Sequence, residues 1–480
     1  ISNNDYMILI DKNGYGYSKY KNKIINRYKQ TDNVDQGIFF FIKNIKTKKI
    51  WSTSNLGYID KSDNYKVSFF PDKSKFSRAD ENIKTTMSIF VTPEEGVEIR
   101  NVELQNIGNE KEILELSTVF EPVLSTKQQD DGHKAFNNLF ISFEIVNNIL
   151  IAKRKARSNS DNDLYMGVML YSDNFINDNI EFELDKRNLC NRTGLEIPYL
   201  IKASKPFTSK IISTTSPIIS IRNSIEVDKN DKALVSLIIS VSENKEDIIQ
   251  NIEKYKSTEN IKRAINLSRA QMEAKIQYFG MTGKDVDLYQ RILSHIVFKS
   301  QSKSEFLKED KLYKTSELWK LGISGDIPIL TVFISEISEI EILEQLVKAF
   351  EFYILQNFPI DLVIVDEEKE SYENYVKEAI NDVVWNSNVI NKKSEGKIFI
   401  LGNLSDNDKK LLKARSNLFI DAKYGKIDLQ LDDYDYEYMK KLKNIKYQNK
   451  ENKTRDFIIE DNTSENKIDM NDLLFYNEYG

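Results

Sequence analysis

Carboxylates are the only abundant side chains in this sequence that could carry acid–base chemistry. The chain has 74 Asp and Glu residues but only two His, and these, His133 and His295, lie far apart. Catalysis that needs several imidazoles is therefore excluded. The single Cys, Cys190, excludes an internal disulfide and a Cys-rich metal site. We expect no metal and no cofactor, and we expect Cys190 to be a buried, inert thiol.

A second group of residues has the chemistry of a sugar-binding site. Between positions 26 and 37, an Arg, a Tyr and two Asp stand close together, and a Trp follows at position 51. Guanidinium and carboxylate groups suit the hydroxyls of a sugar, and aromatic rings offer flat apolar faces to its C–H groups. The same residue types are also typical of a charged sheet edge. This predicted carbohydrate-binding set consists of Arg27, Tyr28, Asp32, Asp35 and Trp51.

A run of acidic residues stands at the end of an apolar stretch that is typical of a buried strand. The stretch covers residues 361–366, and Glu367, Glu368 and Glu370 follow it. Binding sites in open α/β sheets lie at the carboxyl ends of such strands. Charge runs are more often solvated loops, and we favour that interpretation here.

A glycine-containing string from Gly322 to Ile329 is the most distinctive motif in the chain. A phosphate-binding loop follows its strand and ends in Gly-Lys-Ser/Thr, whereas this string precedes a strand and lacks that ending. A nucleotide site is therefore not expected. The glycines instead predict a tight backbone path that brings Trp319 and Asp326 against a neighbouring domain. This predicted domain-contact motif consists of Trp319, Gly322, Gly325 and Asp326.

The elements that must position these residues change in kind along the chain. Residues 1–242 are short β-branched and aromatic runs between turn residues, which predicts antiparallel strands. Residues 243–317 have helical periodicity, and residues 318–430 alternate three strands with helices. Residues 431–480 are charged and Asn-rich, which indicates an extended connector. The predicted fold class is a multidomain α and β protein with a large antiparallel β-sandwich, a helical linker and a small three-layer α/β domain.

Charge and hydropathy narrow the range of partners. The 68 Lys and Arg residues nearly balance the acidic ones, giving a formal charge of -6, so we expect no nucleic-acid partner. No apolar run approaches the roughly 20 residues of a membrane span. The chain starts at Ile1 without a Met or a signal peptide. We therefore expect a piece cut from a longer, cytoplasmic polypeptide, whose parent associates with the inner face of the membrane.

Several strings resemble one family when they are taken in order. They are Gly14-Tyr15-Gly16-Tyr17-Ser18, Arg27-Tyr28, Trp51-Ser52, Phe76-Ser77-Arg78-Ala79-Asp80, Val91-Thr92-Pro93-Glu94-Glu95, Glu121, Asp131-Gly132-His133-Lys134-Ala135-Phe136, Arg154 with Arg157, Trp319 with Gly322 to Ile329, and Asp361-Leu362-Val363-Ile364. Together they resemble glycoside hydrolase family 94, once called glycosyltransferase family 36. That family includes cellobiose phosphorylases and part of the cyclic β-1,2-glucan synthases, and the likeness is greatest to the first β-sandwich unit of those synthases. Departures from the family pattern include Lys186, Asn191, Ser216 and Asp366.

The resemblance implies a sandwich of the galactose-mutarotase-like kind and a parent that processes a β-linked glucan. The parent reaction would be inverting phosphorolysis or a related glucosyl transfer, with an Asp general acid in an (α/α)6 barrel. Such a barrel needs about twelve helices, more than the helical stretches here can form. We therefore assign no catalytic residue and expect a non-catalytic, carbohydrate-binding or scaffolding fragment. Its implied partners are a β-linked glucan or oligosaccharide, and the C-terminal β-sandwich and catalytic barrel of the same polypeptide.

Two other functions remain open on the sequence. One is a self-sufficient carbohydrate-active enzyme that uses carboxylates in the sandwich or near Asp366. The other is a structural dimerisation module, in which the partner is a second copy of the chain. Phosphorolysis by the purified chain would distinguish the first from a scaffold.

Overall fold

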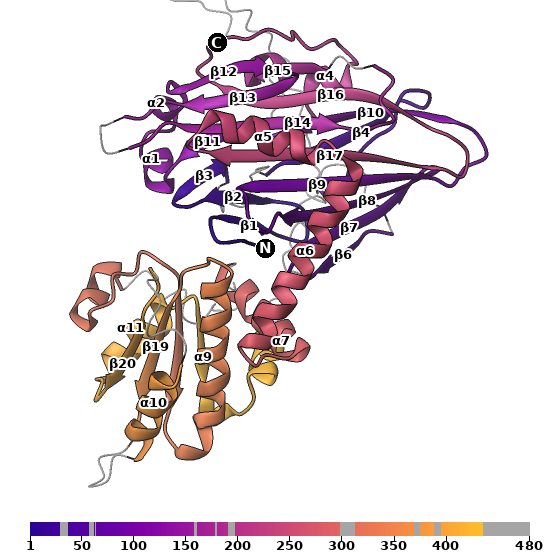
Figure 1. Ribbon diagram of the computed structural model, residues 1–480. Helices are drawn as coiled ribbons and strands as arrows, with labels where there is room; N and C mark the ends of the chain where they lie inside the picture. Colours follow the sequence, from indigo (N-terminus) through magenta and orange to yellow (C-terminus); the bar gives the residue numbers. More distant parts are fainter. Residues whose placement is uncertain are drawn as a thin grey trace, which may run out of the picture.

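The chain forms a large β structure and a smaller α/β structure, joined by helices (Figure 1). The structure is a computed structural model. It describes residues 1–28, 37–56, 62, 64–157, 161–177, 180–190, 197–297, 313–368, 375–387 and 395–434. Of the predicted connector, only residues 431–434 lie within these ranges.

Three antiparallel sheets make up the large β structure. The eight-stranded sheet has the order β12 (Ile141–Val146), β13 (Ile149–Arg154), β14 (Leu164–Tyr171), β17 (Lys232–Ser242), β9 (Val97–Asn106), β8 (Ile83–Val91), β7 (Lys73–Asp80) and β6 (Lys66–Phe69). The five-stranded sheet has the order β15 (Glu181–Asp185), β16 (Pro217–Val227), β10 (Glu112–Val119), β4 (Phe39–Asn44) and β5 (Ile50–Ser52). The four-stranded sheet has the order β1 (Tyr6–Ile10), β2 (Gly16–Tyr20), β3 (Lys23–Asn26) and β11 (Pro122–Ser125). The predicted antiparallel sandwich is confirmed.

Strand β14 shows how alternation builds the two sides of the large sheet. Met166, Val168 and Leu170 point into the main core, because successive side chains of a strand point to opposite faces. The opposite face of the strand packs against helices, and Gly167 lies there. A Cβ on Gly167 would stand 2.3 Å from Cγ2 of Ile248, so the glycine allows the helix to approach the sheet closely.

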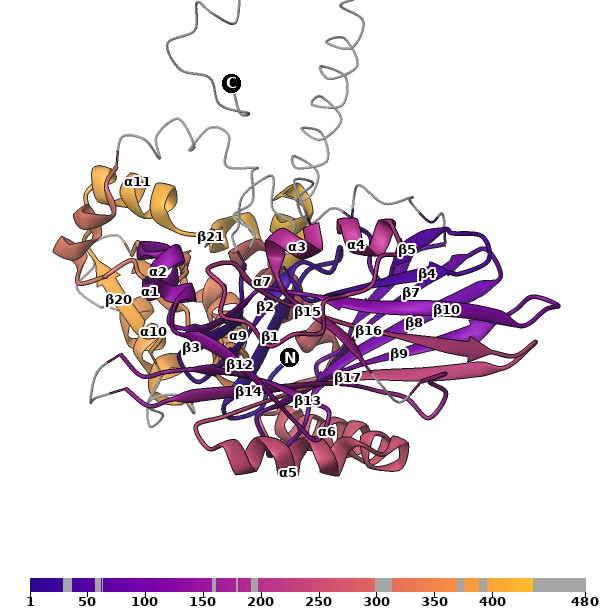
Figure 2. The same ribbon diagram turned by 90° about the horizontal axis from the view of Figure 1, so that it is seen from above.

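Among the residues that the structure describes, only short helices interrupt the sandwich, and longer ones follow it. The short ones are α1 (Lys127–Gly132), α2 (Lys134–Asn138), α3 (Lys186–Cys190) and α4 (Tyr199–Lys202). Those that follow are α5 (Lys245–Tyr255), α6 (Thr258–Tyr278) and α7 (Gly283–Val297). The side chains of Asn244 and Ser257 cap the first turns of α5 and α6. Helices α5 and α6 lie along the outer face of the large sheet (Figure 2).

The smaller structure has three layers around a parallel sheet of order β20-β19-β18-β21. Its elements are η1 (Thr315–Leu321), β18 (Ile329–Ile334), η2 (Ile337–Glu339), α9 (Ile340–Leu355), β19 (Asp361–Asp366), α10 (Tyr375–Trp385), β20 (Ile398–Gly402), α11 (Asp406–Arg415), β21 (Leu418–Asp421) and η3 (Ala422–Tyr424). Helices α7, α9 and α10 contribute to the apolar cluster on one face of the sheet, and η1 and α11 to the cluster on the other. The predicted α/β architecture is confirmed, with β21 as a strand that the sequence did not predict.

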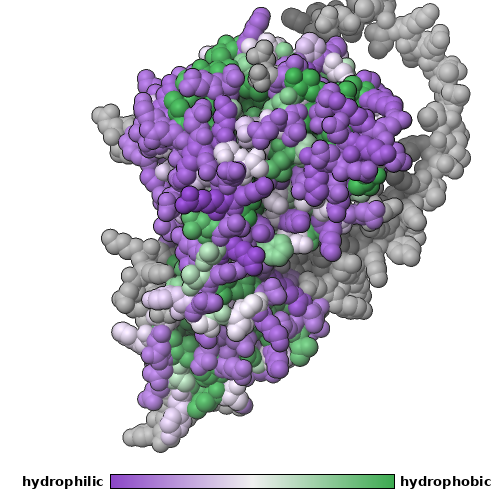
Figure 3. Space-filling view, turned by 45° about the vertical axis from the view of Figure 1, so that its right-hand side comes forward, coloured by the Kyte–Doolittle hydropathy of each residue, from purple (hydrophilic) through white to green (hydrophobic). Residues whose placement is uncertain are grey.

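The first hairpin connects the two structures. Strands β1 and β2 belong to the sandwich, yet Met7 of β1 is buried in the apolar cluster that α7 and α9 form with the parallel sheet. Ser2 donates a hydrogen bond of 3.1 Å to Oε1 of Gln356, just after α9. Elsewhere, hydrophilic residues predominate on the face shown in Figure 3, with apolar residues scattered among them.

Candidate functional site

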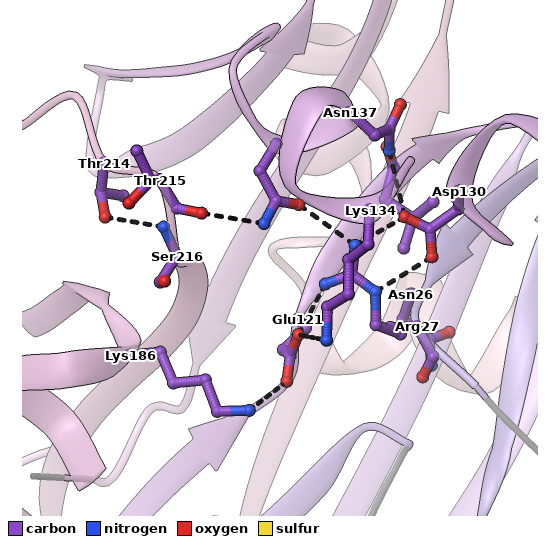
Figure 4. A network of polar contacts seen from close by, with 12 residues as sticks. Asn26, Arg27, Glu121, Asp130, Lys134, Asn137, Lys186, Thr214, Thr215 and Ser216 are labelled. Atoms are coloured by element: carbon purple, nitrogen blue, oxygen red, sulfur yellow. Dashed lines mark hydrogen bonds and ion pairs between the residues drawn. The ribbon is translucent and has the colours of Figure 1, made fainter. Parts of the chain in front are cut away.

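A cluster of charged side chains lies at one end of the sandwich, where several elements meet (Figure 4). Arg27 directly follows β3, and Glu121 lies in the turn between β10 and β11. Asp130 belongs to α1, Lys134 begins α2 and Lys186 begins α3. We call these five residues the Glu121 cluster. The family resemblance singled out four of its members, Arg27, Glu121, Lys134 and Lys186, and Asp130 directly precedes one of the quoted strings. The fold thus brings these separate parts of the sequence together.

The cluster is held by close ion pairs. Nη1 of Arg27 lies 2.6 Å from Oε2 of Glu121. Nε and Nη2 of the same guanidinium donate to the two carboxylate oxygens of Asp130, at 3.0 and 2.6 Å. Nζ of Lys186 lies 2.6 Å from Oε1 of Glu121, and Nζ of Lys134 lies 3.6 Å from Oε2. Both oxygens of Glu121 therefore face cations.

These contacts fix the protonation state of Glu121. Burial by itself would raise the pKa of this carboxyl group, but the attraction of Lys186, Lys134 and Arg27 outweighs burial and lowers the pKa to about 2. The carboxylate is thus ionised at neutral pH and only 6 % exposed. A general acid must carry a proton and reach its substrate, so Glu121 cannot serve as one.

Neighbouring polar groups extend the cluster toward β15 and β16. Oδ1 of Asn138 accepts a hydrogen bond from Arg27 at 3.1 Å, and its amide nitrogen donates to the carbonyl of Thr215 at 2.9 Å. Thr214 in turn donates to Asp185 at 2.9 Å. Lys186, which departs from the family pattern, still places a cation beside Glu121. The arrangement joins strands and short helices to one another, which is a structural role.

The structure does not bring the predicted carbohydrate-binding set together at the surface. Trp51 is fully buried, because its position opposite Ile42 of β4 directs the ring into the core, where its Nε1 donates to Thr85 at 3.2 Å. Arg27 is engaged in the Glu121 cluster. The expectation that these two side chains are presented to a sugar is therefore wrong for this arrangement of strands.

The remaining members of that set are less constrained. Tyr28 is half-buried, and its ring centroid lies 5.6 Å from that of Tyr17. Asp32 and Asp35 lie outside the described residues. A sugar contact by these three residues stays a prediction.

The predicted domain-contact motif has the expected backbone but an exposed surface. Gly322 and Gly325 have φ angles of +77° and +75°, a conformation that favours glycine. The Trp319 side chain is 67 % exposed, and its Nε1 donates to the carbonyl of Ser324 at 3.3 Å. Asp326 is also exposed. Contact of this motif with another domain stays a prediction.

Asp366, Glu367 and Glu368 lie at the carboxyl edge of the parallel sheet, as expected, whereas Glu370 lies outside the described residues. Oδ1 of Asp366 accepts a hydrogen bond of 2.9 Å from the backbone of Glu368, and Oε1 of Glu367 lies 2.7 Å from Nζ of Lys409. Within the described part of the chain, no group of three or more His, Cys, Asp and Glu residues is placed to hold a metal ion. Burial raises the pKa of the Cys190 thiol to about 11, so this thiol is inert at neutral pH.

Sequence reasoning missed the partners of Glu121 and the aromatic contacts next to them. The guanidinium of Arg157 lies over the rings of Phe136 and Phe140, at 4.7 and 5.2 Å from their centroids. The guanidinium of Arg154 lies 5.6 Å from the centroid of Phe140. The resemblance drew attention to both arginines, but the spacing of residues along the chain could not show what they contact.

Comparison with known proteins places these features in a family. Residues 1–258 match the family model described as "Glycosyl hydrolase 94, supersandwich domain". The chain belongs to glycosyl hydrolase family 94. The matched supersandwich covers all three antiparallel sheets and the whole Glu121 cluster.

A curated relative of this family 94 chain is the cyclic beta-(1,2)-glucan synthase NdvB of Rhizobium meliloti (strain 1021). The two are 23% identical over 399 residues, which is 80% of this chain and 14% of that protein. The chain thus spans about a seventh of the length of this relative.

Among solved structures, the chain is similar to a bacterial glucoamylase complexed with acarbose. That match has a TM-score of 0.35 and 14% identity, and covers 60% of this chain and 39% of the glucoamylase. A putative kojibiose phosphorylase from the human microbiome matches with a TM-score of 0.31 and 9% identity, over 56% of this chain and 31% of that one. Among the described helices, none is both long and apolar enough to cross a membrane.

Proposed function

We propose that this chain is a non-catalytic, carbohydrate-contacting scaffold within a β-glucan-processing enzyme of family 94. In this proposal residues 1–242, 243–317 and 318–430 act as sandwich, linker and α/β domain, and the acid-bearing barrel and second sandwich belong to the rest of the polypeptide. The relatedness to a cyclic glucan synthase supports the substrate class. The observation that carries the non-catalytic role is the ionised, fully engaged state of Glu121.

Two carboxyl groups with a raised pKa, Glu115 and Asp361, lack a catalytic setting. Burial raises the pKa of Glu115, whose side chain lies 3.6 Å from Nη1 of Arg222. Burial likewise raises the pKa of Asp361, which is the first residue of β19. It therefore lies at the amino end of a parallel strand, whereas sites in such sheets lie at the carboxyl ends. Inverting phosphorolysis needs a protonated acid beside the scissile bond, and these groups do not supply it.

The Glu121 cluster supports the scaffolding half of the proposal. Its ion pairs join β3, the β10–β11 turn, α1, α2 and α3 at one end of the sandwich. Removing one member of a buried ion pair leaves an uncompensated charge, which is strongly destabilising. A rigid end of this kind suits a domain that must hold another domain in place. We further propose a cytoplasmic location, with the parent enzyme at the inner face of the membrane.

The test is phosphorolysis by the purified chain. We expect no sugar phosphate above the blank when the chain is mixed with 1,2-β-gluco-oligosaccharides and phosphate. Phosphorolysis that disappears in Asp366→Asn or Glu367→Gln, but persists in the matched variant Glu378→Gln on the exposed side of α10, would contradict the proposal. That result would favour the self-sufficient enzyme.

A further inference from the structure

A shallow hollow lies on the outer face of the large sheet, at its β12 edge. It has a volume of about 370 Å³ and is lined by Ser142, Phe143, Glu144, Lys153, Tyr165 and Lys245. We call it the β12–β14 hollow. Its volume is at the lower end of the range of about 300–1,000 Å³ that is usual for small-molecule sites.

The register of the strands explains why these side chains meet. Ser142 of β12 is opposite Lys153 of β13, which in turn is opposite Tyr165 of β14. The three side chains thus form one row across three strands, about 10 Å wide at the usual strand spacing of about 4.8 Å. Helix α5 covers the next part of β14, over Gly167, and its first residue, Lys245, forms the side of the hollow.

Ion pairs hold the charged side chains in place. Nζ of Lys245 lies 2.8 Å from Oε2 of Glu144, and Nζ of Lys153 lies 2.6 Å from Oδ2 of Asp163. All four side chains remain partly exposed. An ammonium has three donors and a carboxylate about four acceptor sites, so one ion pair leaves most of this capacity for a ligand.

The balance of charge and the aromatic ring indicate the class of ligand. The lining holds two ammonium groups and one carboxylate, and Asp163, which pairs with Lys153 from beside the hollow, balances the second ammonium group. The hollow therefore has no unpaired cation that would select an anion. Tyr165 adds a half-buried ring, with the ammonium of Lys153 at 5.1 Å from its centroid. Alternating donors and acceptors beside an aromatic ring suit a neutral molecule with many hydroxyl groups and apolar C–H surfaces.

We propose that the β12–β14 hollow binds a β-linked gluco-oligosaccharide, and the identification of this sugar rests on the proposed function. The hollow lies on the outer face of the large sheet, beside the start of α5, and on different strands from the Glu121 carboxylate. The chain would therefore hold glucan on its outer surface. The expected dissociation constant is on the order of millimolar, as befits a shallow, open site.

Calorimetric titration of the 480-residue chain with 1,2-β- and 1,4-β-gluco-oligosaccharides tests the proposal. We expect Ser142→Trp, which fills the hollow from an exposed position, to weaken binding at least tenfold. The double variant Glu144→Ala/Lys245→Ala removes both members of one ion pair and is expected to weaken binding severalfold. The matched control, Glu103→Ala/Lys232→Ala, removes a pair of 3.0 Å on β9 and β17 of the same sheet, in which the Glu is as exposed as Glu144 and the Lys is more exposed than Lys245. This variant should bind as the unaltered chain does.

Three outcomes would overturn the proposal. They are no binding at tens of millimolar sugar, binding that neither altered hollow weakens, and equal binding of 1,4-α-gluco-oligosaccharides or of inorganic phosphate. Thermal unfolding of each variant shows whether it is folded. If Ser142→Trp is not folded, the double variant Glu144→Ala/Lys245→Ala tests the proposal by itself. None of these outcomes involves phosphorolysis. The proposal of sugar binding in the hollow can therefore be rejected while the proposal of a non-catalytic scaffold is retained.

Discussion

The charge on Glu121 is decided by its neighbours rather than by its burial. Three cations outweigh the cost of taking the carboxylate out of water, and two of them, Lys134 and Lys186, remain partly exposed. The third, Arg27, is almost completely buried and also bonds Asp130 in a bidentate manner. The cluster is therefore a stabilising element whose loss should be measurable.

We expect Glu121→Gln to lower the free energy of unfolding by about 3–5 kcal/mol, because it leaves the buried Arg27 with one carboxylate fewer. Urea denaturation followed by circular dichroism measures this change. Glu110→Gln is the matched control, since Glu110 pairs with Lys46 at an exposed position and should leave the midpoint unchanged. Equal midpoints for the Glu121 variant and the unaltered chain would show that the cluster does not stabilise the fold.

The same carboxylate predicts a dependence on pH. Its pKa is lowered from 4.5 to about 2 on folding, so its contribution is complete above about pH 4.5 and is lost as the pH falls toward 2. A difference of this size corresponds to about 3 kcal/mol. Unfolding curves measured between pH 6 and pH 2.5 should therefore converge for the unaltered chain and Glu121→Gln. Curves that stay equally far apart over this range would contradict the assigned pKa.

Residue chemistry alone could not have located this site. The resemblance pointed to Arg27, Glu121 and Lys134 separately, but their convergence depends on contacts over about a hundred positions along the chain. For Trp51, residue chemistry predicted a surface contact that the fold does not allow. A Trp beside Arg and Asp in sequence fits a sugar site, yet a strand directs alternate residues to opposite faces, and this one faces the core.

At the scale of elements, periodicity predicted most of the architecture. Helix α11, which lies in the region predicted to alternate strands and helices, is capped by Ser405, whose hydroxyl accepts a hydrogen bond from the Asp408 backbone at 3.2 Å. Strand β21 was missed because its four residues, Leu418–Asp421, give too short an apolar run to distinguish a strand from a loop. Strand β21 forms because it pairs with β18, and a pattern within one segment of the sequence gives no information on such a pairing.

The approach of α5 to the sheet gives a test at this scale. We expect Gly167→Ala to lower the free energy of unfolding by about 1–3 kcal/mol, because its Cβ would stand 2.3 Å from Ile248 and 2.6 Å from Ile252. Gly132→Ala, at the end of α1, has no atom within 4 Å and is the control for the same chemical change. Thermal unfolding compares the two. Similar melting temperatures for both variants would mean that α5 can shift away at little cost.

At the scale of the whole molecule, the sandwich and the α/β structure share a core through the first hairpin. Met7 is 3% exposed and lies among side chains of α7, α9 and the parallel sheet. Sequence composition divided the chain into separate regions and so could not predict this shared packing. The two structures are thereby coupled in stability.

We expect Met7→Ala to reduce protection of β18 and β19 amides against hydrogen exchange, with a cost of about 2–5 kcal/mol for the buried side chain. Met169→Ala is the matched control, because Met169 packs in the cluster between the sheet and α5 instead. It should leave exchange in the parallel sheet unchanged. Unaltered protection of β18 in Met7→Ala would show that the two structures are energetically independent.

The position of that hairpin also has a consequence for synthesis on the ribosome. Ser2 and Gln356, which bond one another, are separated by 354 positions. Met7 is therefore translated long before its apolar neighbours in α9 and β19, which follow it by several hundred positions along the chain. Closing a contact between such distant positions is slow, and unsatisfied apolar side chains favour aggregation in the interval. Rapid elongation and a chaperone that shields the nascent hairpin should thus improve the yield of native chain.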